Sequence, residues 1–324
     1  MSDTFNGVDL AALEPDLCVA FPSVVEGRVL QLDGDAACYK VTYNPDEHLR
    51  TCIDNFWSMI DYRRQMAGCE YINIHLTGHN KGGRSEIATV KKYQGNRDGK
   101  VKPQNLIDLR EYLVSLPPAP QRIVYHEDQE ADDGMCQENH TAILAGNRNL
   151  SIIMSEDKDL TMCQGLRCDW NTFEIIDVNG YGKIWLDETG STTKLKGYGS
   201  AFFWAQLLMG DSADNIPGCE LIGAEILEKY DPLIKPNPKR KPKKCGAVLA
   251  YNILKDVTSD MQALLLVIEC YRSYYGNDYK YTAWNGLEIQ RQSIEMLYEQ
   301  AQLLWMRRVQ NESPRAFFKE IMGV

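Results

Sequence analysis

Several common hydrolase signatures are missing from this sequence of 324 residues. The ten cysteines form no C-x-x-C pair, which argues against a zinc ribbon and against a small disulfide framework. The five histidines form no H-E-x-x-H motif, and both the G-x-S-x-G elbow and the Walker loop are absent. Most standard hydrolase chemistries therefore lose support.

Membrane and export signals are missing as well. No apolar run approaches the roughly 18 residues of a membrane span, and the first residues, MSDTFNGVDL, lack the charged and apolar regions of a signal peptide. With 44% hydrophobic and 25% charged residues, the chain has the composition of a soluble globular protein. We expect a cytoplasmic protein with one large α/β domain and a smaller partner domain.

Positive charge is concentrated in two stretches, although the net charge is -10. An acidic protein is at first sight a poor match for nucleic acid, because affinity there depends largely on lysine and arginine neutralising phosphates. Here, however, basic residues gather in segments 80–102 and 235–244, while the acidic residues gather elsewhere. The distribution predicts two basic arms around an acidic centre.

Short apolar runs alternate with helical patterns along the first half of the chain. The runs are RVLQL (28–32), YINIHLT (71–77), RIVYH (122–126) and LSIIMS (150–155), with helical patterns at 45–67 and 106–116. This alternation predicts an α/β fold with a mostly parallel sheet. Ligands of such sheets bind beyond the carboxyl ends of the strands, so the residues after each run are candidates for a site.

Carboxylates follow three of the four runs, and two more follow a later apolar helix at 201–210. In chain order the nine candidates are Asp33, Asp35, Glu130, Asp132, Asp133, Asp157, Asp159, Asp211 and Asp214. Taken singly, each is better explained as a turn residue, a helix N-cap or a favourable charge at a helix N-terminus. Together, at one edge of a sheet, they would repel one another strongly without a counter-ion.

A divalent metal is the counter-ion that these residues favour. Oxygen ligands without histidine or thiolate select Mg²⁺ or Mn²⁺ rather than Zn²⁺. Two such ions about 4 Å apart are a common arrangement for cutting a phosphodiester, because one generates the attacking hydroxide and the other stabilises the leaving oxygen. The pattern therefore predicts a two-metal site.

The ordered motifs LDGD, YQGNR, QEADD, SEDKDL and GDSADNIPG resemble those of the 5′-nuclease superfamily over residues 30–230. This superfamily comprises flap endonucleases, the 5′-nuclease domain of bacterial DNA polymerase I and phage 5′→3′ exonucleases. The DGD after the first strand and the helical C-terminal part look most like the exonucleases of short-tailed phages. The resemblance thus suggests a phage protein that acts in the cytoplasm of a bacterial host.

The resemblance implies a three-layer α/β nuclease core at 1–200, with a basic helical arch at about 80–115. It also implies a helical DNA-binding region at 201–324 with a helix-three-turn-helix element. The implied activity is Mg²⁺-dependent 5′→3′ exonuclease, with 5′-flap endonuclease and RNase H-type activity in replication, recombination or primer removal. We expect two Mg²⁺ ions, Mn²⁺ as a substitute, and a monovalent cation at the helix-three-turn-helix.

Site residues are carried over motif by motif. Asp33 matches the family's first metal aspartate, whereas Asp35 occupies a more variable place and is left out of the ligand set. The remaining expected ligands are Glu130, Asp132 and Asp133 at the first metal, Asp157 and Asp159 toward both ions, and Asp211 and Asp214 at the second metal. Lys158, between two of these ligands, is expected to point away from them into solvent.

Two departures from the family pattern concern catalysis. Gly78 or His79 stands where the family has a further aspartate. We exclude His79 from the ligands because an ordinary surface histidine is the simpler explanation of this residue. Gln94 replaces the lysine that neutralises the scissile phosphate in relatives. We expect Arg97, in register with the family, to act there, with Lys91, Lys92 or Arg84 supplying the missing charge.

Substrate contacts are expected in three places. Lys91 and Tyr93 belong to the basic arch segment, where Tyr93 could stack on a base. Gly218 and Gly223 precede a helix whose backbone amides could cradle a phosphate. In the proline-interrupted loop 235–244, Lys239, Arg240 and Lys241 could follow the DNA backbone, although such a run alone is often only a solvated linker. Contacts of this kind address phosphates, so little sequence preference is expected.

The expected substrates are double-stranded DNA with 5′ ends, nicks or flaps and RNA/DNA hybrids. We also expect replication proteins as partners, no membrane association and a monomer. Two alternatives stay open. One is a DNA-binding structural protein that keeps the fold but has lost turnover, and the other is a nuclease acting on RNA alone. The C-terminal stretches 261–276 and 286–309 are expected to be amphipathic helices that pack in the core.

Overall fold

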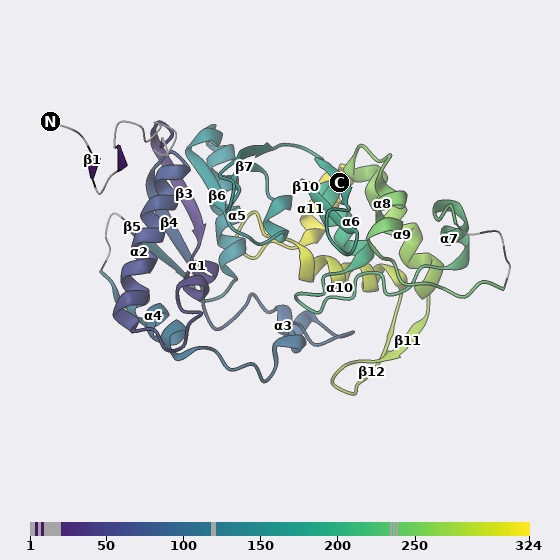
Figure 1. Ribbon diagram of the computed structural model, residues 1–324. Helices are drawn as coiled ribbons and strands as arrows, with labels where there is room; N and C mark the ends of the chain where they lie inside the picture. The colour runs from purple at the N-terminus through teal and green to yellow at the C-terminus, as the bar shows by residue number, and fades with distance from the viewer. Residues whose placement is uncertain are drawn as a thin grey trace.

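A six-stranded sheet organises the first half of the chain, and helices organise the second half (Figure 1). The computed structural model describes residues 4–5, 8–9, 21–117, 121–233, 235, 237 and 239–324. The sheet contains β3 (Val25–Asp33), β4 (Cys69–Thr77), β5 (Gln121–His126), β6 (Ser151–Met154), β7 (Gly165–Cys168) and β8 (Ile175–Val178). The expected α/β fold with a mostly parallel sheet is confirmed.

The strand order is β5-β4-β3-β6-β7-β8, and only β8 runs antiparallel to its neighbour. The chain goes from β3 to β4 and β5 on one side and then returns to place β6 on the other side of β3. Such a reversal of direction leaves a crevice beyond the carboxyl ends of the two strands where it occurs. Those strands are β3, which ends at Asp33, and β6, which leads into Asp157.

Helices cover both faces of the sheet and complete three layers (Figure 1). One face carries α1 (Gly34–Val41), α2 (Leu49–Met66) and α4 (Gln104–Ser115), and the other carries α5 (Ala131–Leu144). Leu32 and Ile74 from the strands pack with Phe56 of α2 in one core cluster, and all three are fully buried. Burial of this apolar layer fixes where the strand ends lie.

The second half packs around a helix that is apolar on every side. This helix, α6 (Ser200–Met209), is buried along almost its whole length, as expected for a helix at the centre of a core. Its neighbours are α8 (Ala247–Leu254), α9 (Asp260–Tyr275) and α10 (Ser293–Leu304), followed outward by α7 (Ala224–Tyr230) and α11 (Pro314–Met322). The hairpins β9–β10 (Lys183–Asp187, Lys194–Tyr198) and β11–β12 (Tyr279–Thr282, Glu288–Arg291) flank the bundle, and a two-stranded piece, β1–β2 (Thr4–Phe5, Val8–Asp9), lies near the N-terminus.

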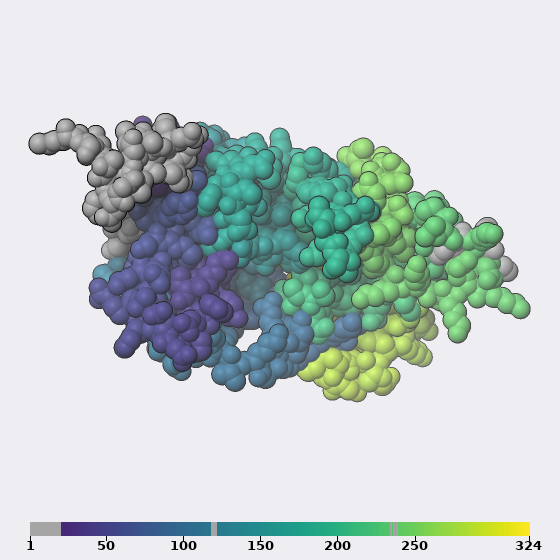
Figure 2. Space-filling model, viewed as in Figure 1, coloured from purple at the N-terminus to yellow at the C-terminus, as the bar shows by residue number. Residues whose placement is uncertain are grey.

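The segment between β4 and α4 joins the two halves along the lower side of Figure 1. Its only helical pieces are α3 (Arg84–Ile87) and a 3₁₀ turn at Gly95–Arg97. The space-filling view shows a small opening between this segment and the α/β part (Figure 2). Of the expected helical arch at 80–115, the part before α4 is thus mostly irregular, and α4 packs on α2 as part of the core.

A second correction concerns stretch 286–309. Its first part forms β12, paired with β11, and α10 begins only at Ser293. Gln292 and Glu295 form a capping box there, which explains why the helix starts at this point. Among the residues that the structure describes, none of the helices combines the length and apolarity needed to cross a bilayer.

Candidate active site

Asp33 ends β3 and is almost fully buried. It lies at the crossover point, where the order of the strands reverses between β3 and β6. Its Oδ1 accepts a hydrogen bond from the Ala36 backbone at 2.9 Å and so caps α1, while Oδ2 accepts one from Ser155 Oγ at 2.7 Å. Burial raises the pKa of Asp33 above its ordinary value, although these two hydrogen bonds oppose the shift. The capping interaction fixes the carboxylate at the carboxyl edge of the sheet.

The first turn of α5 sends its two aspartates in different directions, because successive helical residues are rotated by about 100°. Asp132 faces other acids: burial raises its pKa well above the ordinary value, and the charges of Asp157 and Asp33 raise it further. Asp133 instead faces the interior, where it is fully buried and pairs with Arg84 at 2.9 Å. Asp133, expected as a metal ligand, is therefore corrected to a core ion-pair residue.

Asp157 and Asp159 follow β6 and turn toward the same crevice. The backbone N–H of Asp159 donates to Asp157 Oδ1 at 2.8 Å, and that of Asp157 donates to Ser155 Oγ at 3.0 Å. Asp157 is exposed, whereas Asp159 is buried and accepts a hydrogen bond from Gln206 Nε2 of α6 at 2.5 Å. Burial raises the pKa of Asp159 to about 8, with Asp157 adding to the shift.

Asp211 and Asp214 lie in the turn that follows α6. Asp211 is held by paired backbone hydrogen bonds with Ile216 at 2.7 and 2.8 Å, and its Oδ1 accepts from Ala213 N at 2.9 Å. One carboxylate oxygen each from Asp159, Asp211 and Asp214 lies within 4.8 Å of the others. A single cation could contact all three residues.

Lys158 lies among these carboxylates, contrary to the expectation that it points away. Its Nζ is 3.1 Å from Asp159 Oδ1 and 2.7 Å from Asp211 Oδ2. Burial alone would lower the pKa of Lys158, but the two carboxylates outweigh burial and raise it. The attraction of two acids on one side of the chain explains the orientation that sequence spacing did not predict.

Tyr93, in the arch segment between β4 and α4, links two of the acids that are expected to bind metal ions, Glu130 and Asp214. Its hydroxyl lies 3.1 Å from Glu130 Oε1 and 3.2 Å from Asp214 Oδ2, and the ring is buried. The expectation that Tyr93 stacks on a base is corrected, because the ring is enclosed by the protein. Gln94 donates from its side chain to Asp214 Oδ1 at 2.9 Å, which ties the segment to the turn after α6.

The three cations expected to act in catalysis differ in their surroundings. Arg97 is half exposed and bonds Asp214 Oδ1 at 2.6 Å, at the margin of the site. Lys92 is exposed and pairs with Asp98 at 2.6 Å. Arg84 is only 1% exposed and donates to the backbone carbonyls of Leu303 and Trp305 as well as to Glu130 and Asp133. Arg84 is thus corrected to a buried structural residue.

The backbone N–H groups of Gly218 and Gly223 are both engaged inside the protein. The N–H of Gly218 donates to Gln300 Oε1 at 3.2 Å, and that of Gly223 donates to Ser273 Oγ at 3.0 Å. Gly218 also has a φ of +67°, and a Cβ added to it would lie 2.3 Å from the backbone nitrogen of Gly210. Both glycines allow close packing, so their own N–H groups do not face a phosphate, and the contact predicted for the first backbone amides of α7 stays a prediction.

The basic loop and the arch retain exposed cations. Lys91, Lys239 and Lys241 are exposed, and Arg240 is partly covered, with Nη2 bonded to the Lys235 carbonyl. Among the described residues between 231 and 246, no helix forms. These side chains remain available to solvent, as the predicted DNA contacts require.

Two other residues singled out in the sequence are accounted for locally. Asp35 is paired with Arg110 and accepts from Thr77 N at 3.0 Å, so it supports the start of α1 rather than the acidic group. Gly78 donates to the His126 carbonyl at 2.8 Å, and a Cβ there would lie 2.6 Å from that oxygen. The close approach of two strand ends explains why no side chain stands at Gly78. His79 beside it is exposed.

Lys81 was not singled out from the sequence, although it falls within the basic segment. It is partly buried, and its ammonium bonds Gln94 Oε1. Burial lowers the pKa of Lys81, while Glu130 and Asp214 oppose the shift. Sequence spacing could not distinguish this inward-facing lysine from its exposed neighbours.

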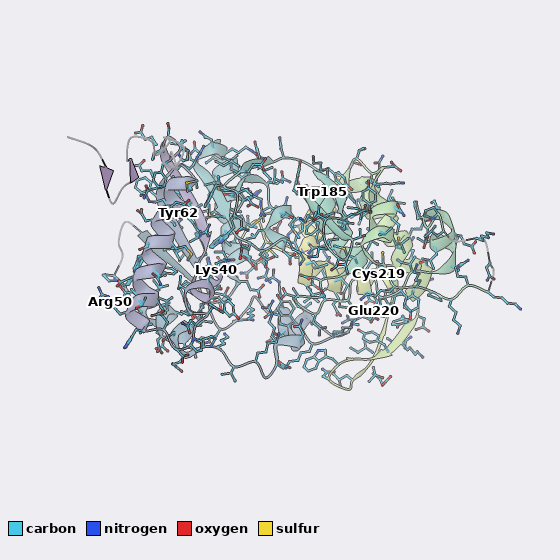
Figure 3. The ribbon with its side chains drawn as sticks, in the orientation of Figure 1. Lys40, Arg50, Tyr62, Trp185, Cys219 and Glu220 are labelled. Atoms are coloured by element: carbon cyan, nitrogen blue, oxygen red, sulfur yellow. The ribbon has the colours of Figure 1, made fainter. Side chains whose placement is uncertain are left out.

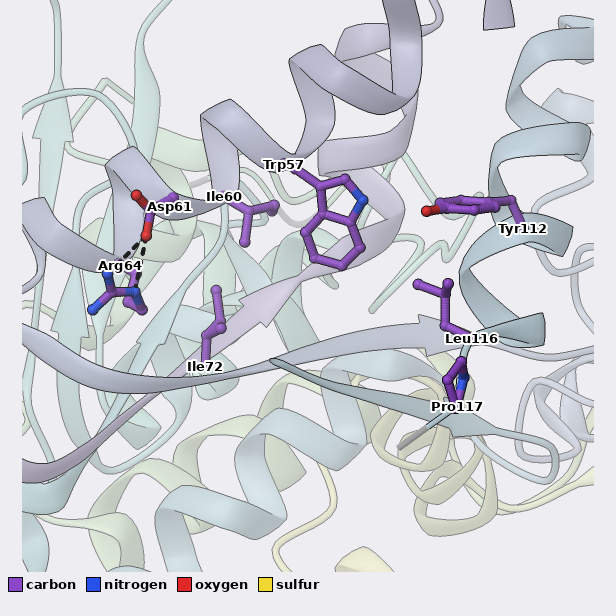
Figure 4. A pocket seen from close by; sticks show the side chains of 8 residues that line it. All are labelled: Trp57, Ile60, Asp61, Arg64, Ile72, Tyr112, Leu116 and Pro117. Atoms are coloured by element: carbon purple, nitrogen blue, oxygen red, sulfur yellow. Dashed lines mark hydrogen bonds and ion pairs between the residues drawn. The ribbon is translucent and has the colours of Figure 1, made fainter. Parts of the chain in front are cut away.

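Figure 3 labels Lys40 of α1, whose ammonium pairs at 2.8 Å with Glu156, the residue before Asp157. A separate apolar pocket of about 410 Å³ lies between α2 and α4, lined by Trp57, Ile60 and Tyr112 (Figure 4). The only acid lining that pocket, Asp61, is paired with Arg64. The pocket therefore has no part in the acidic group.

No family model and no curated protein matches the sequence. The chain is similar to a solved complex of bacteriophage T5 flap endonuclease with DNA and metal ions, at 14% identity over 86% of this chain and 99% of that one, with a TM-score of 0.45. It is similar to a T5 5′-exonuclease with bound zinc, at 15% identity over 86% and 99%, with a TM-score of 0.44. A T5 protein co-crystallised with metal ions gives 15% identity over 77% and 91%, with a TM-score of 0.42.

Proposed function

We propose that this protein is a Mg²⁺-dependent 5′→3′ exonuclease with 5′-flap endonuclease and RNase H-type activity. The observation that carries the proposal is the convergence of Asp33, Asp132 and Asp157 at the crossover point of a parallel sheet, beside the group formed by Asp159, Asp211 and Asp214. Carboxylates from separate parts of the chain meet where such sheets bind ligands. Their mutual repulsion calls for cations.

The residues fit hard divalent ions. All the converging ligands are carboxylate oxygens, and the close group of Asp159, Asp211 and Asp214 contains no histidine or cysteine. Such donors suit Mg²⁺ or Mn²⁺. Asp33, Glu130, Asp132 and Asp157 would hold a first ion, and Asp159, Asp211 and Asp214 would hold a second. Bound there, two ions would lower the pKa of an attacking water and stabilise the charge on the leaving oxygen.

The side chains around the acids supply positioning. Tyr93 and Gln94 hold Glu130 and Asp214 in place and bring the arch segment against the site. Arg97 at the margin would meet a phosphate of the substrate, and Lys92 lies exposed on the same segment. The opening beside the segment would admit a single-stranded 5′ end (Figure 2).

The remaining parts of the proposal concern DNA. Residues 1–200 would form the nuclease core and 201–324 the region that grips the duplex. Lys91, Lys239 and Lys241 would contact phosphates, and the substrates would be nicked or 5′-flapped duplexes and RNA/DNA hybrids, handled in replication or primer removal. Because phosphate contacts carry no sequence information, binding would show little sequence preference.

The test is a product-length assay on end-labelled nicked, 5′-flapped and RNA/DNA duplexes. With Mg²⁺ or Mn²⁺ the protein should release nucleotides or short oligonucleotides from 5′ ends, and chelator should stop the reaction. Asp157→Asn should abolish cleavage while leaving duplex binding intact. Asp177→Asn is the matched control, since Asp177 is exposed and pairs with Arg148 away from the site. Normal binding of a flap without cleavage would overturn the proposal.

A DNA-binding structural protein without turnover is the second candidate. Gly78, with no room for a side chain, and Asp133, paired with Arg84, both reduce the number of acids available to a first metal ion. For such a protein, Asp157→Asn would change neither binding nor any product. The assay above therefore separates the two functions, and competition between labelled RNA and DNA duplexes would expose an enzyme specific for RNA.

A further inference from the structure

Lys158 brings a positive charge between Asp159 and Asp211. These two acids and Asp214 form the close group, with one carboxylate oxygen of each within 4.8 Å of the others. The Lys158 Nζ lies 2.7 Å from Asp211 Oδ2 and 3.1 Å from Asp159 Oδ1. Both carboxylates are more than nine-tenths buried. The ammonium thus occupies space that a cation bound by these acids would need.

Of the acids proposed for the first ion, Glu130 contacts the Arg84 guanidinium at 2.9 Å, and Arg84 is held in the core by the carbonyls of Leu303 and Trp305. Among the described residues, Asp33, Asp132 and Asp157 form no ion pair with a lysine or arginine. Burial raises the pKa of Asp132, and the charges of Asp157, Asp33 and Glu130 raise it further. Ser155 and the Ala36 backbone donate to Asp33, but they are neutral. Within the part of the chain that the structure describes, a cation approaching Asp33, Asp132 and Asp157 meets no ammonium in direct contact with these three carboxylates.

We propose that Lys158 is a displaceable internal counter-ion, which makes the second divalent ion bind more weakly than the first. This inference rests on the proposed function, because it assigns a role within the same site. The first ion binds at Asp33, Asp132 and Asp157, with Glu130 beside them. The second ion reaches Asp159, Asp211 and Asp214 only after the Lys158 ammonium leaves them.

The geometry permits this displacement. The Lys158 side chain is 48% exposed, so its flexible stem can carry the ammonium into water without disturbing the core. Water then solvates the ammonium, and the divalent ion takes over the two carboxylates. Two like charges at contact distance in a partly buried site repel strongly, so both cations cannot stay together.

Direct Mn²⁺ binding to the full chain tests the inference without reference to turnover. Free Mn²⁺ is followed by electron paramagnetic resonance during titration, for the wild type and for Lys158→Met. We expect the wild type to bind one tight and one weaker ion, and the variant to bind the second ion at least about tenfold more tightly because one repelling charge is gone. Lys158→Arg, which keeps the charge, should retain the weak second ion.

Lys196→Met is the matched control, because Lys196 makes an exposed ion pair with Asp187 on the β9–β10 hairpin and its loss changes net charge equally. It should leave both affinities unchanged. Equal affinities in the wild type, or a second ion that is unchanged or weaker in Lys158→Met, would overturn the role of Lys158. A wild type that binds no Mn²⁺ would overturn the proposed metal site as well, whereas equal affinities with normal cleavage would overturn only this inference.

Thermal melting gives a second readout if Lys158→Met is hard to titrate. In chelator the variant should melt below the wild type, because Asp159 and Asp211 lose the ammonium that contacts both of them. At saturating Mn²⁺ the difference should vanish, since the ion replaces the lysine. A variant that melts below the wild type by the same amount in both conditions would contradict displacement.

Discussion

The two acidic groups of the site are built from the same residue type but are balanced differently. Asp132 lies among other carboxylates at the ends of β3 and β6. Asp159 and Asp211, after β6 and α6, contact Lys158, and Asp214 bonds Arg97. Among the described residues, Asp33, Asp132 and Asp157 thus have no cation in contact, whereas cations of the protein partly balance Glu130, Asp159, Asp211 and Asp214.

Under the proposed function, Asp132 serves chemistry and Asp133 serves the fold. A buried carboxylate surrounded by like charge weakens the folded state, and it persists only where another demand maintains it. A carboxylate with its own cation can be structural, as Asp133 is with Arg84. Asp132 and Asp133, neighbours in one turn of α5, therefore compare directly an acid surrounded by acids with an acid paired to a cation.

The largest effect should come from Asp132→Asn. Removing this acid should lower cleavage of a flapped duplex by more than about 100-fold, because residues that only orient a metal ligand already contribute 10–100-fold. Stability in chelator should be unchanged or higher, since one repelling charge is lost. The measurement is the single-turnover rate with Mg²⁺ beside a melting curve. Cleavage at the wild-type rate would break the distinction between the two groups.

The adjacent change, Asp133→Asn, should act mainly on stability. It leaves the fully buried Arg84 without its bidentate partner, and breaking a buried ion pair typically costs about 3–5 kcal/mol. The measurement is the free energy of unfolding from chemical denaturation. Asp177→Asn removes an exposed pair and should cost at most about 1 kcal/mol. Equal stability of the Asp133 variant and the wild type would show that Asp133 is not structural.

The third-largest effect should be on the pH dependence of stability, where Asp159 shows the need for a metal ion. Burial raises the pKa of Asp159 from 3.8 to about 8, so this carboxyl favours the folded state when protonated. Its contribution is fully present below about pH 4 and is lost as the pH rises through about 8. In chelator, Asp159→Asn should therefore gain melting temperature relative to the wild type between pH 4 and pH 8.

Mg²⁺ should shrink this difference, because the ion stabilises the ionised carboxylate of the wild type. Both proteins are compared by thermal melting at matched pH values, with and without Mg²⁺. A variant that loses stability relative to the wild type as the pH rises in chelator would reverse the sign of the argument.

The fold and the meeting place of the acids could be predicted because they depend on local patterns. Apolar runs alternate with helical segments, and each run is followed by the residues that reach the carboxyl edge of the sheet. Asp33, Asp132 and Asp157 come together for this reason. Nothing in that logic requires knowledge of the second half of the chain.

The side-chain directions depend on distant partners and could not be predicted. Arg84 is drawn inward by the carbonyls of Leu303 and Trp305, more than 200 positions away in sequence. Lys158 turns inward because Asp211 arrives from the end of α6. Tyr93 is buried because Glu130 and Asp214 offer its hydroxyl two partners. In each case a charge or hydrogen bond formed by tertiary packing decided the orientation.

The smallest effect should come from Lys241→Ala in the basic loop, which extends the comparison from the acids to the exposed cations. Lys241 is exposed, and a single lysine that contacts phosphate should reduce the slope of log K against log salt by about 1. Fluorescence anisotropy with a flapped duplex in chelator would measure this. Lys319→Ala, on the exposed side of α11, should leave the slope unchanged. An equal change of slope in both variants would mean that net charge, and not a contact made by the loop, governs binding.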